Sequence, residues 1–107
     1  MSPLKANVLI NDLPHTIAVS VGKARLGLGW ERILNIRIQS TTIDRKSPII
    51  GKYKVVELYL GYGVVRCADC VPIATCCTLA QCQAVALSDY IQQAGLELVP
   101  EESTQEV

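Results

Sequence analysis

The chain has 107 residues, enough for one domain with a modest core and too few for a second domain. Half of the residues are hydrophobic and 19% are charged, which excludes an intrinsically disordered chain. The formal net charge is zero, and no apolar run approaches the roughly 20 residues that a membrane-spanning helix needs. Residues 1–14 lack the long apolar region of a secretory signal, so we expect a cytoplasmic protein without a membrane span.

The first third of the chain predicts an antiparallel hairpin followed by a third extended segment. Residues 7–10 (NVLI) and 16–21 (TIAVSV) flank NDLPH, whose Asn, Asp and Pro are typical turn formers. Residues 22–30 (GKARLGLGW) alternate in hydrophobicity and predict a strand or a bend, with Trp30 on the core side. A glycine-rich anion loop is the alternative, but the glycine spacing matches neither a P-loop nor a dinucleotide-binding turn.

The middle of the chain predicts a strand, a loop and a second hairpin. Residues 33–39 alternate strictly, as in a half-buried strand, and residues 44–52 (DRKSPIIGK) carry the charges, Ser-Pro and Gly of an exposed mobile loop. The densest basic stretch overlaps this loop and is a candidate site for a phosphate-bearing ligand: Arg45, Lys46, Lys52 and Lys54.

Residues 53–60 (YKVVELYL) predict a strand that is paired with residues 64–67 across a turn at GYG. One alternating set of its side chains is expected to face the core: Val56, Leu58 and Leu60. The opposite set supplies the candidates for a protein–protein interface: Tyr53, Val55 and Tyr59.

One helix is predicted, from a cap at Thr75 or Thr78 to about Ala94, with Gly95 as its C-terminal left-handed residue. Its expected core stripe is Ala80, Ala84, Leu87, Ile91 and Ala94. Residues 96–100 (LELVP) are expected to add an edge strand. Residues 101–107 (EESTQEV) are expected to form a disordered acidic tail.

These elements predict a single α+β domain over residues 1–100. It consists of a small antiparallel sheet or open barrel of five to seven short strands, followed by one C-terminal helix packed on it. Over residues 7–94 the order of elements resembles that of the pleckstrin-homology type of barrel, in which a C-terminal helix plugs an open end. The resemblance concerns element order alone, and a twisted sheet with the helix on one face fits equally well.

All five cysteines lie between residues 67 and 82. The favoured interpretation is that Cys67 on its strand and Cys76, Cys77 and Cys82 where the sheet meets the helix are buried thiols that pack as small apolar side chains. The alternative is a zinc site made by Cys67, Cys70, Cys76 and Cys77, although only one C-x-x-C pair is present. The spacing fits no iron–sulfur pattern, and the C-x-x-C pair does not open a helix as a thioredoxin-like centre requires. We expect no cofactor.

Catalytic and nucleic-acid-binding functions find little support in the composition. The single histidine, His15, lies in the first turn, and no group of paired carboxylates is apparent, so we expect a protein that is not an enzyme.

The charges are unevenly distributed along the chain: residues 1–54 carry a formal charge of +6 and residues 55–107 carry −6. A basic stripe with aromatic residues could be built from Arg25, Trp30, Arg32, Arg37, Lys52, Tyr53 and Lys54. The zero net charge and a pI near 6.5 nevertheless make nucleic acid an unfavoured partner.

The sequence therefore predicts a small cytoplasmic protein that binds a protein partner or itself, and we expect a homo-oligomer. Apolar strands with open edges or an uncovered sheet face favour such contacts. The alternative is a thiolate metal-binding domain centred on residues 67–82.

Overall fold

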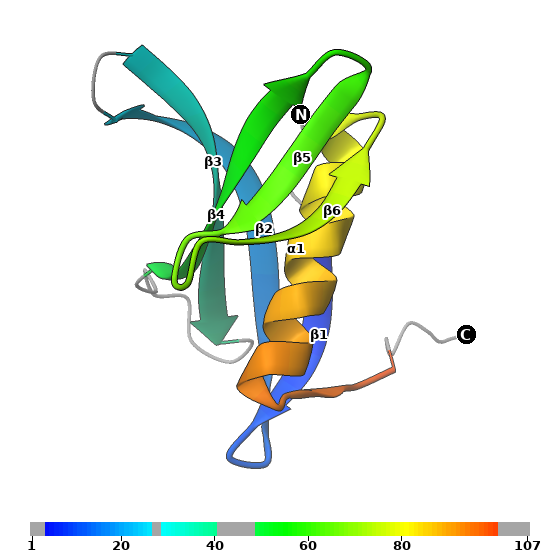
Figure 1. The fold of residues 1–107 in the computed structure, drawn as a ribbon. Helices are drawn as coiled ribbons and strands as arrows, with labels where there is room; N and C mark the ends of the chain where they lie inside the picture. Colours follow the sequence, from blue (N-terminus) through cyan, green and yellow to red (C-terminus); the bar gives the residue numbers. More distant parts are fainter. Residues whose placement is uncertain (1–3, 27–28, 41–48, 101–107) are drawn as a thin grey trace.

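The computed structural model describes residues 4–26, 29–40 and 49–100. These residues form seven strands and one helix (Figure 1). The elements are β1 (Leu4–Ile10), β2 (Leu13–Leu26), β3 (Gly29–Ser40), β4 (Ile49–Leu58), β5 (Gly61–Arg66), β6 (Val71–Cys76), α1 (Leu79–Ala94) and β7 (Glu97–Leu98).

All the strands belong to one antiparallel sheet in the order β6-β5-β4-β3-β2-β1-β7. The sheet curls around α1, which lies along its concave side (Figure 1). Register shifts at Ile36/Arg37 and at Val64/Val65 contribute to the curl, because a bulge increases the local bend and twist of a strand. The predicted α+β fold, an antiparallel sheet with one helix packed on it, is confirmed.

The core lies between the concave face of the sheet and α1. Ile17, Leu34 and Ile36 are its largest strand side chains without solvent exposure, and Cys82 and Ala86 are fully buried on the helix. Gln83 is also buried and donates a hydrogen bond to the carbonyl of Val19, which ties the helix to β2.

The helix was predicted with the correct ends but with an inaccurate buried face. The Thr78 side chain accepts a hydrogen bond from the Gln81 amide, and the Gln81 side chain accepts one from the Thr78 amide, which completes a capping box. Gly95 adopts φ 69° after the last turn. The expected stripe is wrong at Ala80, Ala84 and Ala94, all exposed, because the helix instead turns its larger side chains inward. Its core residues are Leu79, Cys82, Val85, Ala86, Leu87, Tyr90 and Ile91.

The predicted facing of β4 is reversed. Tyr53 and Val55 are 2% and 5% exposed and belong to the core, whereas Leu58 is 47% exposed. The reason is the phase of the charged residues: Lys52 and Lys54 alternate with the core side chains and share the outer face with Val56 and Leu58. Two of the three interface candidates, Tyr53 and Val55, are therefore wrong.

Trp30 was also placed wrongly. It belongs to β3, lies opposite Arg25 of β2 and is 68% exposed, so it is not a core residue. On the core-lining face of β3 the fully buried side chains begin at Leu34, and Trp30 lies nearer the start of the strand, outside the core.

Residues with positive φ lie at two of the reversals of the sheet, the β1–β2 turn and the start of β5. Asn11 and Asp12 both have positive φ (54° and 65°), which a two-residue hairpin turn favours, and they confirm the first predicted reversal. Gly61 has φ 131°, and a Cβ atom there would lie 2.5 Å from the carbonyl oxygen of Cys76. Glycine is therefore required where β5 begins beside the end of β6.

Two expectations fall partly or wholly outside the described residues, and a third is confirmed at the end of the chain's described part. Residues 44–48 of the predicted loop and the predicted tail, 101–107, lie outside the described residues, while residues 49–52 belong to β4. The predicted edge strand near residues 96–100 is confirmed as β7. Within the described ranges, α1 is neither long nor apolar enough to cross a membrane.

Candidate functional site

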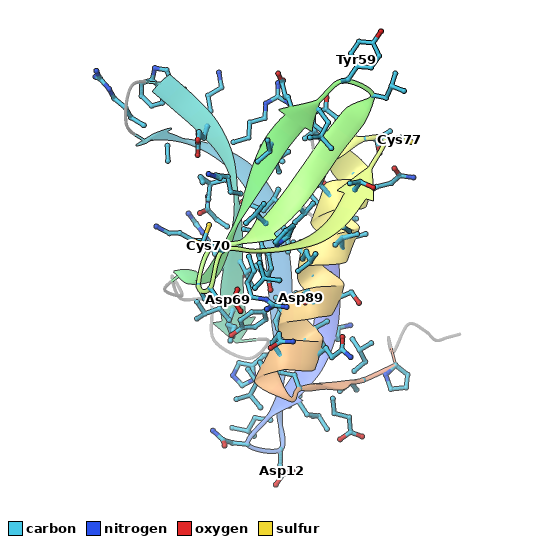
Figure 2. All side chains as sticks on the ribbon, viewed as in Figure 1. Asp12, Tyr59, Asp69, Cys70, Cys77 and Asp89 are labelled. Carbon is cyan, nitrogen blue, oxygen red and sulfur yellow. The ribbon has the colours of Figure 1, made fainter. Side chains whose placement is uncertain are left out.

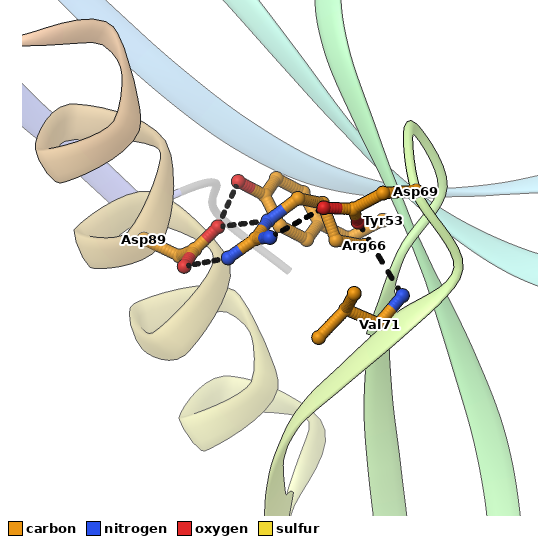
Figure 3. A network of polar contacts seen from close by, with 5 residues as sticks. All are labelled: Tyr53, Arg66, Asp69, Val71 and Asp89. Carbon is orange, nitrogen blue, oxygen red and sulfur yellow. Dashed lines mark hydrogen bonds and ion pairs between the residues drawn. The ribbon is translucent and has the colours of Figure 1, made fainter.

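A polar network joins the helix to the β5–β6 hairpin (Figure 3). The Arg66 guanidinium donates to Asp89 of α1 from Nε (3.0 Å to Oδ2) and from Nη2 (2.8 Å to Oδ1). Its Nη1 donates to Asp69 Oδ2 at 2.8 Å, and Asp69 Oδ1 accepts from the amide of Val71 at 3.3 Å. Tyr53 Oη completes the network by donating to Asp89 Oδ2 at 2.7 Å.

The contacts within this network shift the pKa values of its members so that each keeps its charge state near neutral pH. Hydrogen bonds from Arg66 lower the pKa of the Asp89 carboxyl below its ordinary value of 3.8. Burial, reinforced by the hydrogen bond to Asp89, raises the pKa of the Tyr53 hydroxyl. Hydrogen bonds to Asp89 and Asp69 raise the pKa of Arg66. The phenol therefore stays neutral and the ion pairs stay charged around neutral pH.

A cleft of about 480 Å³ opens beside the network. Its lining includes Arg66, Lys52, Cys67 and Tyr90. Gly51 forms part of the floor, where a Cβ atom would come within 3.1 Å of the Tyr90 ring. Because Arg66 already has carboxylates on two sides, the network fixes α1 to the sheet and leaves little donor capacity for a ligand.

The thiol in the cleft is not set up as a nucleophile. Burial raises the pKa of Cys67, although Lys54 and Lys52 lower it to a lesser extent, so the thiolate is scarce at neutral pH. The only histidine of the sequence, His15, lies on β2, which β3 and β4 separate from β5, the strand that Cys67 follows. The His15 ring instead contacts the carbonyl of Leu13.

The cysteines are not gathered in one place. Cys67 and Cys70 lie at the β5–β6 turn, whereas Cys76 and Cys77 lie at the opposite end of β6; Figure 2 labels Cys70 and Cys77. The alternative zinc site made by Cys67, Cys70, Cys76 and Cys77 is therefore contradicted. No group of three or more His, Cys, Asp or Glu side chains able to hold a metal ion occurs within the described parts of the chain.

The favoured interpretation of the cysteines is correct only in part. Cys82 is fully buried and Cys76 is half-buried, but Cys67, Cys70 and Cys77 are exposed. The error arises because β6 is an edge strand with short turns at both ends, so the thiols at those ends face solvent.

This placement predicts an order of alkylation by iodoacetamide. In the native protein Cys70 and Cys77 should react before Cys67, whose thiol has a raised pKa. Cys82 should react only after unfolding, because it is buried and its pKa is raised to about 11 by burial and by Cys76. Peptide mass spectrometry of timed samples measures the order. Labelling of Cys82 as fast as Cys77 in the native protein would contradict the structure.

The second notable feature is an exposed apolar surface at the β4–β5 turn. We call Val56, Leu58, Tyr59 and Leu60 the hairpin surface; they are 38%, 47%, 97% and 84% exposed. Tyr59 stands at the end of the hairpin and points away from the sheet (Figure 2). Of the predicted interface candidates, only Tyr59 belongs to it. Sequence reasoning missed Val56, Leu58 and Leu60 as surface residues, although their phase with Lys52 and Lys54 was a usable signal.

The basic stretch named from the sequence is only partly described. Arg45 and Lys46 lie outside the described residues. Lys52 and Lys54 lie on the outer face of β4, and Lys54 Nζ is 3.5 Å from Glu31 Oε1.

Comparisons with known proteins found no matching protein family, no similar curated protein and no similar solved structure.

Proposed function

We propose that this is a non-enzymatic binding protein that associates with a second copy of itself through the hairpin surface. The observation that carries the proposal is the exposure of four apolar side chains close together at one end of the sheet. Concentrated exposure of this kind marks interaction sites, whereas scattered exposed leucines are ordinary.

A second copy is the occupant that the chemistry favours. The four side chains of the hairpin surface are uncharged, so two copies can bring these side chains together across a two-fold axis without burying a charge among them. The chain also has no net charge at pH 7, so the two copies do not repel each other over longer distances. The twofold arrangement makes the same four residues serve both partners.

The magnitudes predict a weak, reversible dimer. Complete burial of an aliphatic or aromatic side chain contributes roughly 1.5–3 kcal/mol, so the exposed parts of this surface offer on the order of 10 kcal/mol from two copies. The loss of translational and rotational freedom on association costs about 4–15 kcal/mol. The balance is small, and we expect a dimer whose population depends strongly on concentration.

Binding rather than catalysis is supported by the arrangement of the reactive groups. Arg66 is occupied by Asp69 and Asp89, and the Cys67 thiol has a raised pKa. A cytoplasmic location is part of the proposal, because three exposed free thiols suit a reducing compartment.

Sedimentation equilibrium of surface variants tests the proposal. Tyr59→Lys and Leu60→Lys each place a charge in the centre of the proposed interface, so the dissociation constant should rise at least about tenfold, which corresponds to roughly 1.4 kcal/mol. Both residues lie in an exposed turn, so the fold should be unaffected.

The matched control is Leu13→Lys. Leu13 is 61% exposed and lies beside the β1–β2 turn, at the other end of the molecule from Tyr59 (Figure 2, in which Asp12 marks that turn). Its substitution should leave the dissociation constant unchanged. An equal effect of Leu13→Lys, or a monomeric wild-type protein that binds a different protein through Tyr59, would overturn self-association.

A further inference from the structure

The β2–β3 hairpin carries a cluster of cationic and aromatic side chains on one face. In the antiparallel register Arg25 is opposite Trp30 and Lys23 is opposite Arg32. Directly paired residues lie on the same face of a sheet, and so do residues two apart along a strand. Lys23, Arg25, Trp30 and Arg32 therefore share one face, which we call the arm face.

The arm face continues the core-lining side of the sheet past the paired core residues Val21, which is half-buried, and Leu34, which is buried. It lies on the part of the hairpin that extends away from α1 (Figure 1). Lys23, Arg25 and Trp30 are exposed there and Arg32 is half-buried. Nothing in the described part of the helix covers them.

The cations of the arm face make no ion pair with another described residue. The ion pairs found among the described residues join Lys54 to Glu31 and Arg66 to Asp69 and Asp89, and none of them involves the arm face. Glu31 belongs to the opposite face, because it alternates with Trp30 and Arg32 along β3. Among the described residues, Lys23, Arg25 and Arg32 thus place three positive charges without an ion pair around an exposed indole.

Two acidic residues border this surface. Glu31 and Glu57 both line a depression of about 280 Å³ together with Trp30 and Arg32, and Glu31 also lies 3.5 Å from Lys54. Glu57 is the one of the two without an ion pair among the described residues, and it limits the positive potential on that side.

We propose that the arm face binds single-stranded nucleic acid, with an unpaired base stacked on Trp30 and neighbouring phosphates bound by Lys23, Arg25 and Arg32. An exposed indole ring offers a stacking platform that any base can use, and flanking cations attract the backbone. Duplex bases are already stacked on each other and cannot use the ring in this way. The zero net charge of the chain does not oppose this binding, because the positive charge is gathered locally on the arm.

The proposal predicts a specific dependence on salt. Three phosphate contacts to a single strand give a slope of about −2 in a plot of log affinity against log salt. Affinity should therefore fall roughly 20-fold between about 50 and 200 mM salt. A contact made by stacking alone would show little of this dependence.

Fluorescence of the natural chain gives a direct readout, because Trp30 is its only tryptophan. Titration with an oligodeoxythymidylate of about ten nucleotides, a length within the usual site size, should quench the emission of Trp30 as a base stacks on it. Inorganic polyphosphate, which has no bases, should leave the emission almost unchanged.

Variants are compared by the anisotropy of a labelled oligonucleotide. Trp30→Ala should weaken binding roughly tenfold or more, since stacking is lost. Arg25→Gln and Arg32→Gln should each weaken binding and make the salt slope shallower by about 0.7. Glu57→Gln should strengthen binding, because it removes an acidic group at the margin.

The matched control is Arg37→Gln. Arg37 is an exposed arginine of the same strand, but it alternates with Ile36 and Ile38 and lies on the opposite face. Its substitution should change binding much less than Arg25→Gln does.

Four results would overturn the proposal. They are the absence of oligonucleotide binding at low salt, quenching by polyphosphate equal to that by the oligonucleotide, binding to anionic lipid vesicles without binding to the oligonucleotide, and an Arg37→Gln effect equal to that of Arg25→Gln. None of them bears on self-association, because Tyr59 and Leu60 take no part in the arm face.

Discussion

Replacing Leu34 with alanine should destabilise the protein by about 3 kcal/mol, the largest effect that we expect from a single core truncation. Leu34 has no solvent exposure and lies at the centre of the concave face, paired with Val21 on β2 and Tyr53 on β4. Truncation removes buried methyl groups and leaves a cavity that three strands and a helix cannot close easily. Urea unfolding followed by circular dichroism measures the free energy of unfolding.

Leu58→Ala is the matched control for this prediction. The sequence pattern placed both leucines in the core, but Leu58 is 47% exposed, so its truncation should cost about 1 kcal/mol or less. The comparison is made at low protein concentration, where dimerisation contributes least. A loss at Leu58 as large as that at Leu34 would mean that the side chain of Leu58 faces the core, which contradicts the structure.

Replacing Asp89 with asparagine should give the second large effect, a loss of about 2 kcal/mol, which is typical of hydrogen bonds to a charged group. The Asp89 side chain is 14% exposed and holds both Arg66 and Tyr53. Asp69→Asn is the matched control, because Asp69 contacts the same guanidinium but is 48% exposed. Its loss should stay below about 1 kcal/mol. Equal effects of the two substitutions would show that Asp89 does not fix the helix to the sheet.

The same network predicts how stability depends on pH. The pKa of Asp89 is lower in the folded protein than its ordinary value of 3.8, so its contribution is present above that pH and is lost as the pH falls through the folded value. The pKa of Tyr53 is raised above 10.0, so its contribution is present below that pH and is lost as the pH rises further. Unfolding at a series of pH values should show that the difference between wild type and Asp89→Asn shrinks in acid. A difference that is constant down to the lowest pH would contradict the role of the Asp89 charge.

The element order of the fold could be predicted because its signals are local. Turn residues such as Asn11 and Asp12, strict alternation in β2 and β3, and the cap residues Thr78 and Gly95 each indicate an element without reference to the rest of the chain. The cap was left open between Thr75 and Thr78, and the structure selects Thr78. The prediction of a separate strand or bend over residues 22–30 is wrong, because residues 22–26 continue β2 and residues 29–30 begin β3.

The facing of individual residues was predicted less well, because facing is set by partners that are distant in the sequence. Alternation in β4 defines two faces but does not say which one α1 covers, and the apolar residues Val55 and Val56 are adjacent. Trp30 continues a core-facing series on its strand, yet the helix does not reach that far. Neither error could be avoided by propensity alone, although the phase of Lys52 and Lys54 favoured the correct choice in β4.

The candidate surfaces depend on the same long-range contacts. The arm face exists because the β2–β3 register brings Arg25 beside Trp30 and Lys23 beside Arg32, which the sequence pattern alone does not show. The Arg66–Asp89 pair joins residues 23 positions apart on different elements. The cysteines are close together in the sequence but not in the structure, because β6 separates Cys70, which precedes the strand, from Cys76, at which it ends.

The most direct test of self-association is native mass spectrometry of the unmodified chain over a wide range of protein concentration. We expect a species of twice the 11.6 kDa chain mass whose share rises with concentration, in keeping with a weak dimer formed through the hairpin surface. A spectrum that contains only the 11.6 kDa chain at every concentration would contradict the proposed function.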